Sequence, residues 1–256
     1  MNEWLNILFR WIHVIAGVMW IGHLYFFNFV NAQVAKSYDA DSKRKVVPEL
    51  MPRALYWFRW GAAWTWITGF LLLGIVYYMG GVLIEPDSTM SVGVAAAIGV
   101  AVLFAGFLIY DVLWKSGLKA KPQAGTAVSL VLLAAVAWSL GCCFTGRAAF
   151  IHVGAILGTI MAANVWMRIW PAQRKIIAAI KAGQAPDAAL VAMAGLRSKH
   201  NTYMSVPLLF LMVSNHYPAV YGGSDSWAWA VGFVLIGFGI AWFLFRKAGG
   251  PEPAKF

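Results

Sequence analysis

The chain has 256 residues, of which 61% are hydrophobic and 12% are charged. So few charged residues could not cover a water-soluble domain of this size, which excludes an ordinary soluble protein. The formal net charge is +10, but the twenty Lys and Arg residues gather in a few loops. This distribution indicates membrane topology and makes nucleic acid a poor choice of partner.

Seven apolar stretches are long enough to cross about 30 Å of hydrocarbon. In chain order they are Trp4 to Val30, Ala54 to Met79, Val92 to Trp114, Thr126 to Phe144, Ala148 to Trp170, Asn201 to Tyr217 and Trp227 to Phe245. The first stretch has no signal-peptide cleavage site and is expected to span the membrane. The sequence therefore predicts an all-α polytopic membrane helix bundle of about seven transmembrane helices, forming one domain over residues 1–256.

The loops between these stretches alternate in charge. The loop after the first stretch carries Lys36, Lys43, Arg44, Lys45 and Arg53, whereas the next carries Glu85 and Asp87. Because basic loops stay on the cytoplasmic side, the N-terminus is expected outside and the C-terminus in the cytoplasm. The predicted location is the bacterial inner (cytoplasmic) membrane, with lipid as the surrounding partner.

The segment 171–199 is too polar to span the membrane. Within it Ile176, Ile177 and Ile180 recur at helical spacing opposite Lys175 and Lys181. This pattern predicts an amphipathic helix lying on the cytoplasmic membrane surface. A docking site for a cytoplasmic partner is the alternative interpretation.

All five histidines lie in or at the ends of the predicted spans, where ionisable groups are costly. They are His13, His23, His152, His200 and His216. Acidic residues are almost absent from the spans, so imidazoles acting as metal ligands are favoured over a carboxylate proton relay. Helix bundles commonly hold haem between facing helices, so all five are candidate ligands of haem iron and the expected cofactor is haem b, in one or two copies.

The predicted topology sorts the histidines by depth. His13, His152 and His216 fall near the outer face, and His23 and His200 near the inner face. Arg10 and Arg147 precede His13 and His152 and are placed to neutralise haem propionates. Arg59 either pairs with a propionate on the inner side or extends toward the interface. The structural alternative is that each histidine only bonds a neighbouring helix.

Several motifs resemble the membrane domain of the bacterial membrane-bound urate oxidase (urate hydroxylase) family, over nearly the whole chain. They are Arg10 to Gly17 with Trp20-Ile21-Gly22, Met51-Pro52-Arg53 with Trp57-Phe58 and Trp64 to Gly69, Gly146-Arg147 with Phe150 to Ala155 and Gly158 to Val165, and Arg197-Ser198 with His200-Asn201 and Ser214 to Pro218. The resemblance implies an inner-membrane protein linked to purine oxidation or respiratory electron flow. It also implies that electrons pass to a c-type cytochrome.

This sequence departs from that family in three places. It has no C-x-x-C-H motif for covalent haem attachment, so we expect the C-terminal cytochrome c domain of the longer members to be lacking and a separate c-type cytochrome to act as acceptor. The first loop, Ala32 to Pro52, is short and basic where longer members are expected to carry an extra segment. His23 stands where a small residue is expected.

Three functions fit these observations. The first is a haem b protein that transfers electrons across or within the membrane in a respiratory or oxidase pathway. The second is a membrane-bound oxidase or hydroxylase of urate or a similar small reductant, in which one histidine acts as a base or leaves an iron position open. The third is a structural subunit of a respiratory complex. The sequence assigns a catalytic residue to none of these three functions.

Overall fold

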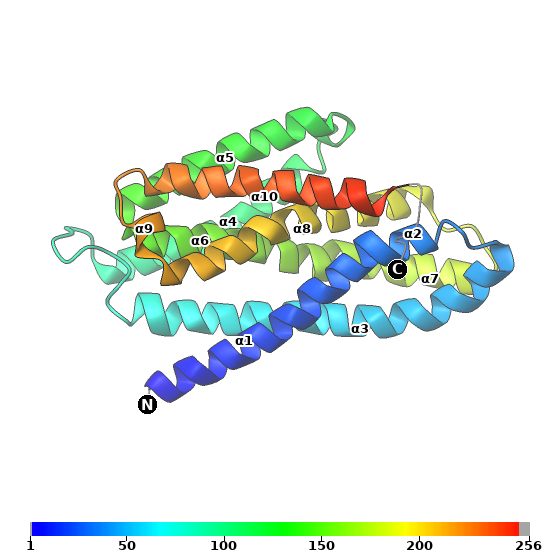
Figure 1. The fold of residues 1–256 in the computed structure, drawn as a ribbon, viewed down its shortest axis with the longest axis horizontal. Coiled ribbons are helices and arrows are strands. Elements are labelled where there is room, and N and C mark those ends of the chain that lie inside the picture. Colours follow the sequence, from blue (N-terminus) through cyan, green and yellow to red (C-terminus); the bar gives the residue numbers. More distant parts are fainter. Residues whose placement is uncertain (1, 251–256) are drawn as a thin grey trace.

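A computed structural model describes residues 2–250 of the chain, and helices are the only regular elements in that range (Figure 1). The long helices are α1 (Asn2–Tyr25), α3 (Ala40–Leu72), α4 (Val92–Leu113), α5 (Pro122–Cys143), α6 (Gly146–Asn164), α8 (Ala188–Val213) and α10 (Ser226–Ala248). The shorter ones are α2 (Ala32–Val34), α7 (Trp170–Lys181), α9 (Pro218–Tyr221), the π-helical turns η1 (Phe26–Asn31), η2 (Leu73–Tyr78) and η4 (Val165–Ile169), and the 3₁₀ turns η3 (Gly117–Ala120) and η5 (Ser214–His216). The predicted all-α fold is confirmed.

Six helical segments in the described range are long and apolar enough to cross a membrane. For example, α4 has 22 residues, which at about 1.5 Å per residue gives about 33 Å. The remaining predicted stretch, Asn201 to Tyr217, covers the second half of α8, η5 and the residue after it, and is not among the six. Polar residues such as Asn201, Thr202 and Ser205 lower its hydropathy, yet these three are fully buried against other helices.

Helix α6 occupies the centre of the bundle. Of the 18 most apolar consecutive residues in the segment Gly146–Lys181, 78% are buried. In the other candidate spans the corresponding share lies between 11% and 28%. The outer helices instead expose large apolar side chains, for example Val18 on α1, Leu108 on α4 and Val131 on α5. A bundle that turns such residues outward is suited to a lipid surrounding.

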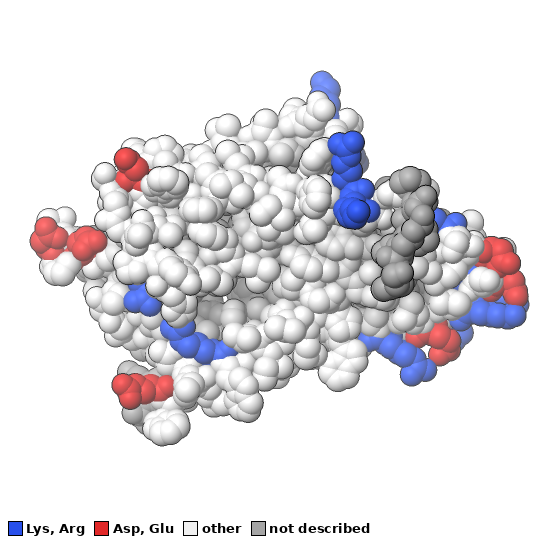
Figure 2. Space-filling view, viewed as in Figure 1, with Lys and Arg blue, Asp and Glu red and all other residues white. Residues whose placement is uncertain are grey.

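Charged side chains gather toward the two ends of the molecule, with an uncharged band between them on the face drawn in Figure 2. The long helices run alternately from one end to the other, so α1 begins at the end opposite to that where α10 finishes (Figure 1). This arrangement agrees with a multi-pass membrane protein. The side that faces the cytoplasm stays a prediction from the loop charges.

The basic loop expected over Ala32 to Pro52 is largely helical, which corrects that boundary. Helix α3 already begins at Ala40 and contains Pro48 and Pro52. Its start is fixed by Asp39, whose side chain accepts a hydrogen bond of 2.7 Å from the backbone N–H of Ser42. The hydrogen bond to Ser42 also lowers the pKa of Asp39.

The amphipathic segment does contain the expected helix, α7. Its buried face, with Ala172, Ile176 and Ile180, packs with Ala194 of α8 and Val47 of α3. Those isoleucines are therefore covered by protein. Contact of residues 171–199 with a membrane surface stays a prediction.

Candidate functional site

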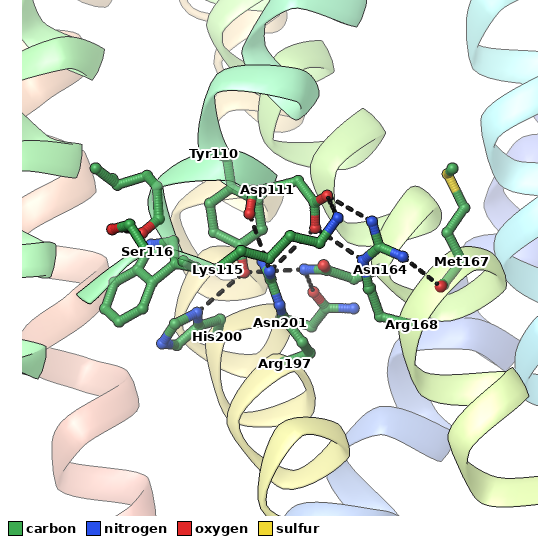
Figure 3. Close-up of polar contacts among 12 residues, drawn as sticks. Tyr110, Asp111, Lys115, Ser116, Asn164, Met167, Arg168, Arg197, His200 and Asn201 are labelled. Atoms are coloured by element: carbon green, nitrogen blue, oxygen red, sulfur yellow. Dashed lines mark hydrogen bonds and ion pairs between the residues drawn. The ribbon is translucent and has the colours of Figure 1, made fainter. Parts of the chain in front are cut away.

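A polar cluster lies inside the bundle where α4, α6, α8 and η4 meet, and we call it the inner cluster (Figure 3). It consists of Tyr110, Asp111, Lys115, Asn164, Arg168, Arg197, His200 and Asn201. The π-helical turn η4 is followed by Pro171, which has no N–H to give to the preceding helix. That turn carries Arg168 next to α4.

Asp111 is the only carboxylate of the inner cluster, and three cations surround it. Its oxygens lie 2.7 Å from Lys115 Nζ, 2.5 Å from an Arg168 nitrogen and 3.0 Å from Arg197 Nη2. Three positive charges and one negative charge leave a formal excess of +2, on side chains that range from 2% exposed for Arg197 to 55% exposed for Lys115. Such an excess favours an anion nearby.

Two buried polar atoms of the inner cluster have no hydrogen-bond partner within residues 2–250. They are Nη1 of Arg197, a donor, and Oδ1 of Asn164, an acceptor. Arg197 is 2% exposed and Asn164 is fully buried. Because unpaired buried polar atoms are costly, each of these two atoms would be stabilised by a further hydrogen-bond partner, such as a water molecule or a polar ligand.

A hydrogen-bond chain across three helices ends at His200. Asn164 Nδ2 donates to the Tyr110 hydroxyl over 3.1 Å, and that hydroxyl lies 2.9 Å from His200 Nδ1. The tyrosine proton has no other acceptor among its described hydrogen bonds, and a neutral His200 with its proton on Nε2 would let the hydroxyl donate to Nδ1. Nε2 points away from the inner cluster in Figure 3.

His200 also lines a cavity of about 830 Å³ bounded by α4, α5, α6, α8 and α10. Most of its wall is apolar, as at Leu133 and Ile156, and the Trp114 ring lies 4.2 Å from the His200 ring between centroids. Ile109 and Leu132 are exposed at the wall, on the outer helices α4 and α5. The cavity therefore opens toward the lipid between these two helices.

A second polar group, the outer cluster, lies at the opposite end of the bundle. It consists of Tyr77, Tyr78, Arg147, His152 and Asn215. The π-helical turn η2 directs both tyrosines toward α6. Tyr77 donates to Asn215 Oδ1, and Arg147 Nε donates to the same oxygen over 3.2 Å.

His152 is enclosed in the outer cluster and uses both ring nitrogens. Nδ1 lies 2.7 Å from the Ala148 carbonyl oxygen, to which it donates, and Nε2 lies 3.0 Å from the Tyr78 hydroxyl. A Cβ added at Gly99 would lie 2.8 Å from Nε2. This packing leaves Nε2 no room for a haem plane.

The other predicted site residues lie apart from both clusters. His13 Nδ1 lies 3.2 Å from Thr68 Oγ1, and His23 Nδ1 bonds the Met19 carbonyl of its own helix over 2.7 Å. His216 is exposed at the end of η5. Among the described residues, no hydrogen bond or ring contact joins any two histidines, and no group of three or more His, Cys, Asp or Glu side chains is placed to hold a metal.

The predicted arginines have partners other than histidine. Arg10 is exposed and donates to Asn6 over 2.6 Å, while Arg59 lies 4.1 Å above the Trp170 ring. Sequence reasoning did not propose Arg197, Arg168, Tyr110 or Asn164 as site residues. Two residues of the sequence indicate this cluster, because Asp111 and Asn164 are polar residues within strongly apolar stretches.

A family model described as urate oxidase N-terminal matches residues 1–45 and 38–255, which together cover nearly the whole chain. The two matched segments overlap where the first interhelical connection enters α3. No curated protein and no solved structure matches the chain.

Proposed function

Since this chain belongs to the urate oxidase N-terminal family, we propose that it is a membrane-embedded oxidoreductase that oxidises urate or a similar small anionic reductant. The observation that carries this proposal is the charge of the inner cluster. Three cations surround the single carboxylate of Asp111, and one nitrogen of the buried Arg197 has no hydrogen-bond partner in the described part of the chain. A small anion would compensate both features.

The chemistry of a purine anion suits the two unpaired atoms. Its carbonyl oxygens accept hydrogen bonds, which Arg197 Nη1 can donate, and its ring N–H groups donate to an acceptor such as Asn164 Oδ1. A flat heterocycle also stacks on aromatic rings, and Tyr110 lies beside the Arg197 guanidinium at 4.8 Å from its ring centre. Binding by Arg197 and Asn164 would thus be specific for a planar anion that carries both donors and acceptors.

Oxidation of the reductant releases electrons that must leave the chain. The proposed acceptor is a separate redox carrier, with a separate c-type cytochrome or another respiratory subunit as the expectation from the sequence. The proposed location is the bacterial inner membrane, with the N-terminus outside. On that orientation the inner cluster lies toward the cytoplasm, where the reductant would enter.

Haem b stays a prediction from the sequence, and its fit differs between the histidines. A six-coordinate haem needs two ligands on opposite faces of the ring, and His152 has both nitrogens engaged. His200 lines a cavity large enough for a cofactor, and ligation there would require an unprotonated Nε2, with Nδ1 as the donor to the Tyr110 hydroxyl.

Urate-dependent reduction of an electron-accepting dye by the purified protein in nanodiscs tests the proposal. The folded wild type is expected to reduce the dye, and Arg197→Lys is expected to raise KM about tenfold, because it keeps the charge and loses the second donor. Arg53→Lys is the matched control, since Arg53 pairs with Glu49 on an exposed surface. A folded wild type that never reduces the dye would reject the proposal and favour a structural subunit.

A further inference from the structure

We propose that the cavity beside His200 binds a lipid-soluble quinone, with the quinone carbonyl accepting a hydrogen bond from His200 Nε2. The cavity is about 830 Å³, within the range of about 300–1,000 Å³ of ligand sites in proteins. Its apolar wall and its opening between α4 and α5 admit a molecule that arrives from the lipid. Its polar end offers a donor to that molecule.

The direction of the hydrogen bond selects the kind of ligand. In the tautomer that lets Tyr110 donate to His200 Nδ1, the nitrogen left for a ligand carries a proton and requires an acceptor. A quinone carbonyl is such an acceptor, whereas a saturated acyl chain has none. The indole ring of Trp114, 4.2 Å from the His200 ring, adds an aromatic surface next to that position.

Neighbouring residues place the polar end of the site near the membrane surface. Lys199 and Gln123 line the cavity together with His200, while Leu133 and Val136 line it from farther along α5. A quinone head group at His200 would contact the polar end of the cavity, and its tail, directed toward Val136, would contact the apolar wall. This is the arrangement expected for an amphipathic redox carrier that lies along the membrane normal.

The role of the quinone as electron acceptor rests on the proposed function, whereas its binding does not. In that role, two electrons and two protons leave the small reductant and end on the two carbonyl oxygens of the quinone, which becomes the quinol. Tyr110 belongs to the inner cluster and also lines the cavity. The reductant site and the quinone site would thus share one wall.

Photolabelling of the purified full-length protein in quinone-free nanodiscs with an azidoquinone tests the binding. Mass spectrometry is expected to find the label on residues of α4, α5 or α8 that line the cavity, and excess decylubiquinone is expected to prevent it. Decylbenzene, which has the tail and no carbonyl, is expected not to compete. Label found elsewhere, or equal competition by decylbenzene, would overturn the proposal.

Two pairs of variants separate a filled site from a misfolded protein. Ala127→Trp fills the cavity from α5 and is expected to reduce labelling about tenfold, while Ala135→Trp, at an exposed position of the same helix outside the cavity, leaves it unchanged. His200→Leu is expected to weaken competition by decylubiquinone about tenfold, and His216→Leu, at an exposed histidine outside the cavity, not at all. Equal effects within either pair would contradict the proposal.

Two further readouts distinguish quinone binding from haem binding in the same cavity and from the proposed oxidation of urate. A Soret band in the purified protein that disappears in His200→Leu would place haem in the cavity and overturn the quinone proposal. Quinone labelling that persists in a protein without urate-dependent dye reduction would reject the proposed reductant and keep the quinone site. Dye reduction without cavity labelling would keep the proposed reductant and reject the quinone site.

Discussion

Arg197 and Asp111 form an ion pair inside the bundle, with Arg197 Nη2 lying 3.0 Å from Asp111 Oδ1. The exposed fraction of the side chain is 2% for Arg197 and 8% for Asp111. The two residues lie on α8 and α4, 86 positions apart in the chain. The pair thus joins two helices at a depth where an isolated charge would be strongly unfavourable.

Removing the carboxylate is expected to destabilise the protein severely. Asp111→Asn leaves Lys115, Arg168 and Arg197 without their counter-ion, and breaking a buried pair costs about 3–5 kcal/mol. The measurement is the free energy of unfolding in detergent micelles. Asp41→Asn is the control, because its i,i+4 pair with Lys45 is exposed and contributes about 1 kcal/mol or less. Equal losses in the two variants would contradict the assigned role of Asp111.

Helices α8 and α10 are expected to tolerate no added methyl group where Gly237 contacts Pro207. A Cβ at Gly237 would lie 2.7 Å from Pro207 Cδ and 2.8 Å from Pro207 N. Gly237→Ala is therefore expected to cost about 1–3 kcal/mol in thermal or denaturant unfolding. Gly239→Ala, on the same helix with nothing within 4 Å of its added Cβ, is expected to be neutral or to stabilise by up to about 1 kcal/mol. A stable Gly237→Ala would show that the two helices can separate.

His152 is expected to contribute to stability and not to haem ligation. Tyr78→Phe leaves His152 Nε2 without its partner, which costs about 1–3 kcal/mol for a buried polar atom. Unfolding of Tyr78→Phe and His152→Gln measures this contribution. Any Soret band of the purified protein should keep its intensity in both variants, and its loss in His152→Gln would restore the outer histidines as iron ligands.

The orientation of the bundle is expected to follow the loop charges. In a variant with Cys142 and Cys143 replaced by Ala, the exposed positions Asp87→Cys and Lys119→Cys serve as single labelling sites at opposite ends of α4. A membrane-impermeant maleimide applied to intact cells should label Asp87→Cys, and Lys119→Cys only after permeabilisation. The opposite pattern would invert the topology.

Most of the fold could be predicted from the sequence, because a spanning helix is a local property of about twenty residues. The stretch Val92 to Trp114 and helix α4 differ by one residue at one end. The stretch Asn201 to Tyr217 has a weaker hydropathy signal, since it contains polar residues that only the neighbouring helices bury. Helix α3 begins at Ala40, ahead of the stretch predicted from Ala54, because the Asp39 side chain caps it and Pro48 and Pro52 do not end it.

The sequence by itself determined a multi-helix membrane protein with five costly histidines and a family resemblance that the family match supports. Only the tertiary structure decided what those histidines contact. His152 meets Tyr78, 74 positions away, and His200 meets Tyr110, 90 positions away. Hydropathy is set by neighbours in the chain, whereas a hydrogen bond across a bundle depends on the rotation and depth of each packed helix, which no local pattern encodes.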